Sequence, residues 1–366
     1  MPETNKAYRK ILVITNVPAP YRIPVFNLLA ERYGDNITVM YSHFAGRQWS
    51  GSTEAMNHNF VALKGKTIRI FNHRIRINYY ILSELLKAKP DMIVNAGLSV
   101  TNVVAWLYSR MFGKKHVVLS DTWALPESKL TITHRVLREL VFRFSDAFVC
   151  IGAKGRDYFR SFNISPRSIF VSPLSVDNLK YREYLGSEKR FDLVFSGQFV
   201  SRKMPLFVID VVKRVNELRP NTTLLMMGSG RLEKEIISKL DRAGIRYQYA
   251  GFVEQKDLPI HYSSARILLF PSQYDAWGVV ANEAMAAGLP VVTCDDAGAA
   301  NDLVQDGVNG FVLPLDVDIW SERIVDLLSN PEKYRRFSEN ALKKVSDYSF
   351  DRSANGIIQA IEYVSG

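Results

Sequence analysis

The chain has 366 residues, of which 47% are hydrophobic and 23% charged, and these ordinary globular proportions exclude a disordered or collagen-like protein. Its length predicts two domains. Its two cysteines, Cys150 and Cys294, are too few for a disulfide framework, which favours a reducing compartment. The net charge is +10, but residues 1–175 carry 24 Lys and Arg against 11 Asp and Glu (+13), and the remainder carries 23 against 26 (−3). The basic first part could meet nucleic acid, an anionic membrane face or a phosphorylated substrate.

The sequence contains neither a candidate membrane-spanning segment nor the pattern of a signal peptide. No run of about 18 uncharged apolar residues occurs. The opening MPETNKAYRKILVIT passes from a polar tail into a strand-like run, without the apolar core or cleavage site of a signal peptide. We therefore expect a cytoplasmic protein.

Short apolar runs alternate with helical patterns along the chain. Several runs are continuous in Val, Ile and Leu, which is typical of strands covered on both faces. The predicted strands are Ile11–Asn16, Ile37–Tyr41, Met92–Gly97, Val117–Ser120, Ala147–Gly152, Ile169–Pro173, Leu193–Gly197, Thr223–Gly228, Tyr247–Gly251, Ile267–Pro271, Val291–Cys294 and Phe311–Leu313. The predicted helices between and after them include Ile23–Arg32, Leu206–Leu218, Trp320–Leu328 and Arg352–Val364.

Strand–helix alternation predicts right-handed βαβ units and parallel sheets, hence an α/β protein. The pattern lapses at Pro173–Leu185 and then restarts. We predict two Rossmann-like doubly wound domains, residues 1–175 and 176–345, facing across a cleft. Residues 346–366 form a C-terminal helix that could pack back on the first domain. Ligands of such sheets bind at the carboxyl ends of the strands.

The most informative stretch is 267–294, ILLFPSQYDAWGVVANEAMAAGLPVVTC. A buried strand is followed by a polar loop and by Gly278, after which the backbone N–H groups of Gly278, Val279 and Val280 open a helix and form a ready anion site. Asp275 precedes this helix and Glu283 lies within it, and two carboxylates beside a phosphate-sized site can accept hydrogen bonds from sugar or ribose hydroxyls. The alternative is an amphipathic helix with a solvent-facing Glu and an ordinary cap.

These residues resemble the motif of glycosyltransferase family 4, retaining nucleotide-sugar transferases of the GT-B fold, in which two acids separated by seven residues precede Ala-Met-Ala-x-Gly-x-Pro-Val. Further segments resemble the family in order: LVFSGQFVSRKM, TTLLMMGSGRLEKEI, YAGFVEQKDLPIHYSSA, DLVQDGVNGFVLP and the opening TNVPAPYRIPVFNLLAE. Together they cover most of residues 191–315 and the first strand and loop.

The resemblance implies roles for individual residues. Glu283 matches the acid that holds the donor ribose, and Asp275 matches the acid, usually Glu, that meets hydroxyls of the transferred sugar. Lys203 matches the lysine that neutralises the donor diphosphate. Gln198 stands where the family often has Arg, so that Arg202 could supply that charge. The residues Phe252 and Val253 mark the backbone that would read the base.

On the first domain, Pro18-Ala19-Pro20-Tyr21-Arg22 stands in place of the family's Gly-Gly loop, and Arg22 is counted among the substrate-binding candidates. Asp121 follows a buried strand at its carboxyl end, where the family often places a His or Asp, and it is the acceptor-side catalytic candidate. The alternative is that Asp121-Thr122 caps a turn. The six histidines are expected to be surface or packing residues.

The implied reaction is transfer of a hexose from a nucleotide sugar, with retention, to a glycan or lipid-linked acceptor, in bacterial polysaccharide or glycolipid assembly. Lys203, Arg202 and the helix N–H groups would stabilise the leaving diphosphate. No metal or other cofactor is expected: no His/Cys cluster has zinc spacing, and Asp295-Asp296 is interpreted as a structural turn. An epimerase or phosphorylase of the same fold and a non-catalytic basic adaptor are the alternatives, whereas Glu233 at the third glycine position argues against a dinucleotide fingerprint at Gly228-Ser229-Gly230.

Two basic segments bear on partners. Residues 64–76 contain six basic side chains and no acid, and Leu130–Phe144 predicts an amphipathic helix with Arg135, Arg138 and Arg143. One interpretation is a core-facing helix with a solvated basic face. The other is peripheral contact with an anionic membrane at its inner face, which would bring a lipid-linked acceptor to the enzyme. No motif for nucleic acid accompanies the charge, so no nucleic-acid partner is expected.

Overall fold

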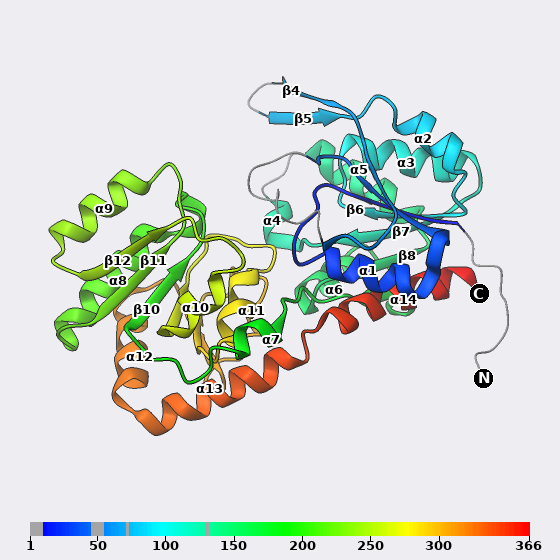
Figure 1. The fold of residues 1–366 in the computed structure, drawn as a ribbon. Coiled ribbons are helices and arrows are strands. Elements are labelled where there is room, and N and C mark those ends of the chain that lie inside the picture. The colour runs from blue at the N-terminus through cyan, green and yellow to red at the C-terminus, as the bar shows by residue number, and fades with distance from the viewer. Residues whose placement is uncertain (1–9, 45–54, 71–72, 129–131) are drawn as a thin grey trace, which may run out of the picture. The chain divides into compact units, whose positions relative to one another are not determined.

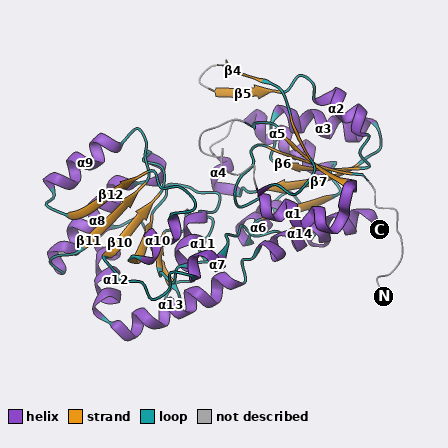
Figure 2. Cartoon of the chain, viewed as in Figure 1, coloured by secondary structure: helices purple, strands orange, loops and turns teal. Residues whose placement is uncertain are grey.

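The computed structural model describes residues 10–44, 55–70, 73–128 and 132–366. The chain divides into two compact units, unit 1 (Met1–Leu174 with Phe350–Gly366) and unit 2 (Ser175–Ser349). Each unit has its own parallel sheet with helices on both faces (Figures 1 and 2). The α/β architecture with two doubly wound sheets is therefore confirmed.

The sheet of unit 1 has seven parallel strands in the order β3-β2-β1-β6-β7-β8-β9. Its strands are β1 (Ile11–Thr15), β2 (Ile37–Tyr41), β3 (Phe60–Ala62), β6 (Met92–Ala96), β7 (Lys115–Ser120), β8 (Ala147–Cys150) and β9 (Ile169–Val171). Its helices are α1 (Ile23–Tyr33), α2 (Ile81–Ala88), α3 (Val100–Met111), α4 (Ala124–Ser128), α5 (Ile132–Arg143), α6 (Ala153–Arg160) and α14 (Phe350–Ser365), with 3-10 turns at Gly34–Asn36 and Pro166–Ser168.

Strand β1 shows why the apolar runs are continuous. Ile11 and Val13 pack with α1 and α14 on one face of the sheet, and Leu12 and Ile14 pack with α2 and α3 on the other. Because side chains alternate between the faces of a strand, a sheet covered on both faces needs apolar residues at every position. The C-terminal helix α14 lies against α1, β8 and β9 and completes this core.

The sheet of unit 2 has six parallel strands in the order β12-β11-β10-β13-β14-β15. They are β10 (Phe191–Ser196), β11 (Thr223–Met227), β12 (Arg246–Gly251), β13 (Ala265–Phe270), β14 (Val291–Thr293) and β15 (Gly310–Val312). The helices are α7 (Asn178–Arg182), α8 (Pro205–Leu218), α9 (Glu233–Arg242), α10 (Leu258–Ser263), α11 (Val279–Ala286), α12 (Val317–Ser329) and α13 (Pro331–Ser346), with a 3-10 turn, η4, at Ser201–Lys203. The order reverses between β10 and β13, so the carboxyl ends of these two strands form the switch point at which doubly wound sheets bind ligands.

All twelve predicted strands are present, with ends that differ by at most two residues. Strand β3 was not predicted, and neither was an antiparallel hairpin of β4 (Lys66–Ile70) and β5 (His73–Ile77). The hairpin contains most of the basic 64–76 segment, of which residues 71–72 lie outside the described part. A short edge strand and an alternating Ile/basic hairpin carry no continuous apolar run, and this explains why that pattern did not reveal them.

The expectation of a solvated basic face on the helix predicted at Leu130–Phe144 is wrong in part; residues 129–131 lie outside the described part. In α5, Arg138 is buried beside Val141 and Phe142, and its Nη1 lies 3.3 Å from the Tyr158 hydroxyl. The apolar residues Ile132 and Val136 are instead 77% and 62% exposed. Helical periodicity identifies an apolar side but not whether another element covers it. Within the described residues, no helix has the length and apolarity needed to cross a bilayer.

Candidate functional site

The predicted donor-side residues of unit 2 lie on two loops that leave the switch point. The loop after β10 contains η4 with Arg202 and Lys203, and the loop after β13 runs from Pro271 to Gly278. The two loops are hydrogen-bonded to each other: the Gln273 N–H donates to the Arg202 carbonyl at 2.9 Å, and the Ser272 hydroxyl donates to the same oxygen at 3.3 Å. Residues more than sixty positions apart are thus held together by backbone geometry.

Asp275 forms ion pairs with Arg202 and Lys203, the two cations of the first loop. Its Oδ2 accepts a hydrogen bond from the Lys203 ammonium and lies 3.5 Å from Nη1 of Arg202, which also donates to the Tyr274 carbonyl at 2.9 Å. The Asp275 backbone is fixed in turn by the Asp296 carbonyl and the Gly298 N–H. One carboxylate beside two cations leaves a net positive group that can receive an anion such as a phosphate.

Helix α11 begins beside this group. Its first residue follows Gly278, which has φ +98°, and a Cβ there would come within 2.0 Å of the Phe270 ring, so only glycine fits. The Trp277 indole N–H donates to the Asn282 side chain at 2.8 Å and fixes the chain where it enters the helix. The N–H groups of Val279 and Val280 belong to the first turn, which has no intrahelical acceptors. This is the helix N-terminus predicted as an anion site.

Glu283 lies deeper in the same helix and is 6% exposed. Its Oε2 accepts a hydrogen bond from the Tyr262 hydroxyl at 2.9 Å. Burial raises the pKa of the Glu283 carboxyl above its ordinary value, while the hydrogen bond from Tyr262 and the neighbouring side chains of Gln255 and Tyr181 oppose the rise. The alternative of a solvent-facing Glu is therefore wrong, because every side chain from Ala281 to Ala286 is buried.

The remaining candidates of unit 2 lie on neighbouring loops. Gln198, directly after β10, and Phe252, after β12, are exposed, and Val253 is half-buried. The turn Gly228-Ser229-Gly230 packs on the loop after β10: a Cβ at Gly228 would lie 1.9 Å from the Gly197 carbonyl oxygen. Close packing between loops accounts for these glycines without a dinucleotide.

In unit 1, the structure brings together two candidates that are far apart in the sequence. The buried Arg22, which precedes α1, pairs through Nη2 with Oδ1 of Asp121, whose side chain is 43% exposed after β7. Burial and the charge of Asp121 raise the pKa of the neighbouring Tyr21 hydroxyl. The Thr122 N–H is 3.4 Å from Ser120 Oγ, and the Asp121 carboxylate faces Arg22. An ion pair therefore replaces the turn cap that was the alternative for Asp121.

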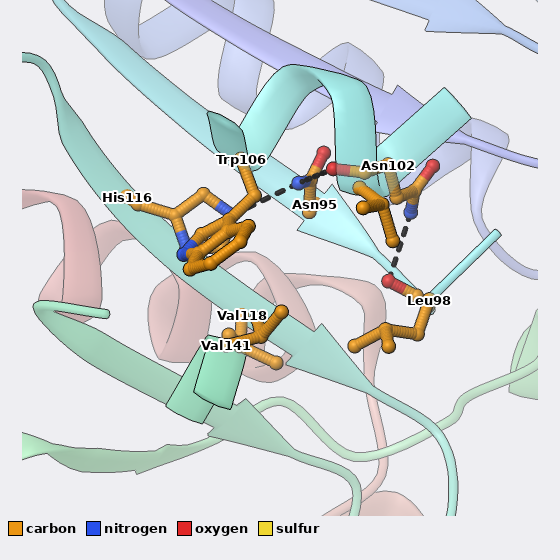
Figure 3. Close-up of a pocket in the computed structure, with 9 residues that line it drawn as sticks. Asn95, Leu98, Asn102, Trp106, His116, Val118 and Val141 are labelled. Carbon is orange, nitrogen blue, oxygen red and sulfur yellow. Dashed lines mark hydrogen bonds between the residues drawn. The ribbon is translucent and has the colours of Figure 1, made fainter. Parts of the chain in front are cut away.

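A buried polar cluster in unit 1 has a structural explanation. His116 lies among the residues drawn in Figure 3 and accepts a hydrogen bond at Nε2 from Asn95 at 2.9 Å. Its Nδ1 lies 2.8 Å from the Ser145 hydroxyl. Burial lowers the pKa of His116 to about 3, so this ring is neutral. The surrounding side chains, including Trp106 and Val141, leave no space for a water molecule. His116 is thus a packing residue, as predicted.

The residues that the structure describes contain no group of three or more His, Cys, Asp or Glu placed to hold a metal ion. The predicted turn at Asp295-Asp296 forms bonds within the protein: Asp295 accepts from Asn301 at 2.8 Å, and the Asp296 carbonyl accepts from the Asp275 N–H at 3.0 Å.

Tyr181 and Tyr262, the two tyrosines at Glu283, were not among the predicted site residues. Tyr262 lies inside the segment YAGFVEQKDLPIHYSSA that was matched to the family, but nothing local distinguishes it from a core aromatic residue. Tyr181 lies on α7, within the segment Pro173–Leu185 where the strand–helix pattern lapses. Their role becomes visible only when the fold brings α7, α10 and α11 together.

Part of the chain is similar in sequence to known glycosyltransferases. Residues 177–344 match the family model described as glycosyl transferases group 1. An uncharacterised glycosyltransferase of Methanocaldococcus jannaschii is 30% identical over 52% of this chain and 50% of its own, so the match spans about half the length of that relative. The GalNAc-alpha-(1->4)-GalNAc-alpha-(1->3)-diNAcBac-PP-undecaprenol alpha-1,4-N-acetyl-D-galactosaminyltransferase of Campylobacter jejuni is 22% identical over 74% of each chain.

Among solved structures, Anabaena HepE in complex with UDP and glucose superposes with a TM-score of 0.78 at 19% identity, covering 97% of this chain and 100% of that one. A likeness at this identity concerns the fold. Unit 2 is thus the part that matches glycosyl transferases group 1, and the chain as a whole has the GT-B fold that the sequence predicts.

Proposed function

We propose that this protein is a glycosyltransferase that moves a hexose from a nucleotide-sugar donor, with retention and without a metal ion, to a glycan or lipid-linked acceptor. The observation that carries the proposal is the arrangement at the switch point of unit 2. There Lys203, Arg202 and the start of α11 surround Asp275, and the buried Glu283 lies further along the helix. These are the groups needed for a diphosphate next to hydroxyl-bearing sugars.

In the proposed reaction, the bond between the anomeric carbon and the donor phosphate breaks, and its electron pair leaves with the nucleoside diphosphate. The acceptor oxygen forms the new bond on the same face, and its proton passes to the departing phosphate oxygen. Lys203, Arg202 and the N–H groups of Val279 and Val280 stabilise the negative charge that develops on the leaving group. Asp275 orients the two cations and accepts from hydroxyls of the sugar. Gln198 and the backbone at Phe252 and Val253 border the nucleotide.

We assign acceptor binding to unit 1. Arg22 and Asp121 form a charged pair at the carboxyl ends of β1 and β7, where Asp121 keeps an exposed side that can accept a hydrogen bond from an acceptor hydroxyl. The name of the Campylobacter relative specifies an undecaprenol-linked acceptor, which makes lipid-linked glycans the first acceptors to test. Such a substrate would place the enzyme at the inner face of the plasma membrane.

Helix α5 supports a peripheral contact with an anionic membrane. Ile132, Val136 and Leu140 follow one another at four-residue spacing on its exposed side, and Arg135 and Arg143 are exposed near them. Apolar side chains flanked by cations suit the interface of an anionic bilayer. Sedimentation with phosphatidylglycerol vesicles should recover the protein, phosphatidylcholine vesicles should not, and Val136→Asp should weaken recovery while the exposed control Val308→Asp should not. Equal recovery of wild type and Val136→Asp contradicts this contact.

The activity is tested by nucleoside-diphosphate release from UDP-, GDP-, ADP- and dTDP-sugars, with EDTA and with a membrane extract as acceptor source. UDP-sugars come first because the HepE structure contains UDP. Release from one donor, stimulated by the extract and unaffected by EDTA, supports a metal-independent transferase, and NMR of the product checks retention. Conversion of the nucleotide sugar to another nucleotide sugar without an acceptor indicates an epimerase, and a requirement for inorganic phosphate indicates a phosphorylase. No reaction with any donor indicates the non-catalytic adaptor.

A further inference from the structure

The carboxylate of Glu283 is surrounded by side chains from other elements of unit 2. Tyr262, on α10, donates its hydroxyl to Oε2 at 2.9 Å and is fully buried. Tyr181, on α7, is also buried, and its ring centroid lies 6.1 Å from that of Tyr262. Glu283 therefore lies beside two phenols, and Oε2 is already occupied by one of them.

The hydroxyl of Tyr181 is a buried polar group without a hydrogen bond of normal geometry among the described residues. The Tyr181 ring lies beside that of Tyr262, whose hydroxyl donates to Glu283. Burial raises the pKa of the Tyr181 hydroxyl, and the charge of Glu283 raises it further. A buried donor that lacks a partner costs free energy. A small shift of Glu283 or Tyr181 would satisfy the hydroxyl by a second hydrogen bond to the carboxylate.

Helix α7 is fixed at the places where the chain passes between the units. Asn178 donates to the carbonyls of Val345 at 3.1 Å and Tyr348 at 3.3 Å, and Arg182 donates to the carbonyl of Leu342 at 3.3 Å. The units join at residues 174–175 and 349–350, so α7 contacts the chain near both connections. It also packs on α10 and α11, which places Tyr181 next to Glu283.

On the basis of the proposed function, we propose that Tyr262 and Tyr181 are positioning residues: they hold the Glu283 carboxylate charged and oriented so that it accepts hydrogen bonds from the ribose of the donor. Tyr262 occupies one acceptor position on Oε2, and Gln255 also lies at the carboxylate, so the ribose would take the acceptor positions that remain. A buried carboxylate needs hydrogen-bond donors of this kind to stay charged. The same hydrogen bonds restrict the orientation of its side chain, as a precise binding site requires. Neither tyrosine needs to touch the nucleotide.

The test is isothermal titration calorimetry of the full chain. UDP, GDP, ADP and dTDP are first titrated into the wild type, and the ribonucleotide that binds is then compared with its 2′-deoxy form in Tyr262→Phe, Tyr181→Phe and Glu283→Gln. Because dTDP already lacks the 2′-hydroxyl, binding of dTDP alone would overturn the assignment of Glu283 to a ribose. The matched control is Tyr334→Phe, which removes a hydroxyl that donates to the Arg266 carbonyl in the same unit. Circular dichroism verifies that each variant is folded.

We expect Tyr262→Phe to weaken binding of the ribonucleotide about tenfold and Tyr181→Phe by a smaller factor, because a hydrogen bond to a charged group is lost. The loss should be smaller with the 2′-deoxy form, and adding either substitution to Glu283→Gln should cause no further loss. A purely structural role predicts equal losses with both ligands.

Equal losses with both ligands, additive effects on Glu283→Gln, or unchanged affinity in both tyrosine variants overturn the inference while leaving the proposed function in place. Failure of the wild type to bind any of the four nucleotides overturns the proposed function itself, and this inference with it.

Discussion

The two units share a doubly wound sheet but build their candidate sites in different ways. In unit 2, the charged groups at the switch point are fixed by many bonds: loops cross-linked through the Arg202 carbonyl, a carboxylate shared by two cations, and a buried Glu283 held by Tyr262. In unit 1, the site rests on the pair Arg22–Asp121 with one partly exposed member. This difference is what we expect if unit 2 binds the donor and unit 1 the acceptor, as proposed.

The largest expected effect is in unit 2. Lys203→Ala should lower donor turnover by about a hundredfold or more, because it removes the cation nearest the leaving diphosphate and leaves Asp275 without its closest partner. Steady-state nucleoside-diphosphate release measures this, with the exposed Lys213→Ala as control. Turnover like that of the wild type would exclude Lys203 from the phosphate site.

Glu283→Gln should weaken nucleotide binding by about tenfold to a hundredfold, since hydrogen bonds to a charged carboxylate become hydrogen bonds to a neutral amide. Equilibrium titration with the preferred nucleoside diphosphate measures this, and Glu235→Gln on the exposed side of α9 is the control. An unchanged dissociation constant would remove Glu283 from the nucleotide site.

In unit 1, a smaller effect of a different kind is expected. Asp121→Asn keeps an oxygen that can accept from Arg22 but loses the charge, so acceptor-dependent turnover should fall about tenfold. Nucleotide affinity should stay the same. Transfer rates measure the effect on acceptor-dependent turnover, and titrations measure the effect on nucleotide affinity. The exposed Asp157→Asn on α6 is the control for both. A drop in nucleotide affinity would contradict the division of roles between the units.

The last expected effect concerns the free energy of unfolding instead of activity, and it has opposite signs in the two units. Burial lowers the pKa of His116 to about 3 and of His58 to about 4, so unfolding takes up protons below pH 6.5 and unit 1 loses stability as the pH falls through this range. Burial raises the pKa of Glu283, so its contribution is present at low pH and is lost as the pH rises through the raised value.

Urea unfolding between pH 4 and 7, followed in wild type, His116→Gln and Glu283→Gln, tests both signs. One proton contributes a slope of about 1.4 kcal/mol per pH unit within its range. His116→Gln should flatten the loss of stability on acidification, and Glu283→Gln should remove the loss on raising the pH. Parallel profiles for all three proteins would show that neither group titrates on unfolding.

Most of the fold could be predicted from local sequence patterns, and so could those site residues that lie close together in the sequence. Strands of a sheet covered on both faces appear as apolar runs, and Asp275, Gly278 and Glu283 are close in sequence, so one loop and one helix reveal them together. The partners could not be predicted: Tyr262 with Glu283 and Arg22 with Asp121 meet only through tertiary packing. The prediction of which side of α5 faces solvent was wrong in part for a similar reason, because periodicity does not tell which neighbouring elements cover a helix.

The central claim is that unit 2 binds the donor at its switch point. The most direct measurement is a crystal structure of the full chain with the nucleoside diphosphate that it binds. The account predicts the diphosphate between Lys203 and the N–H groups of Val279 and Val280, with the ribose at Glu283. A nucleotide bound beside Arg22 and Asp121, or away from Glu283, would contradict it.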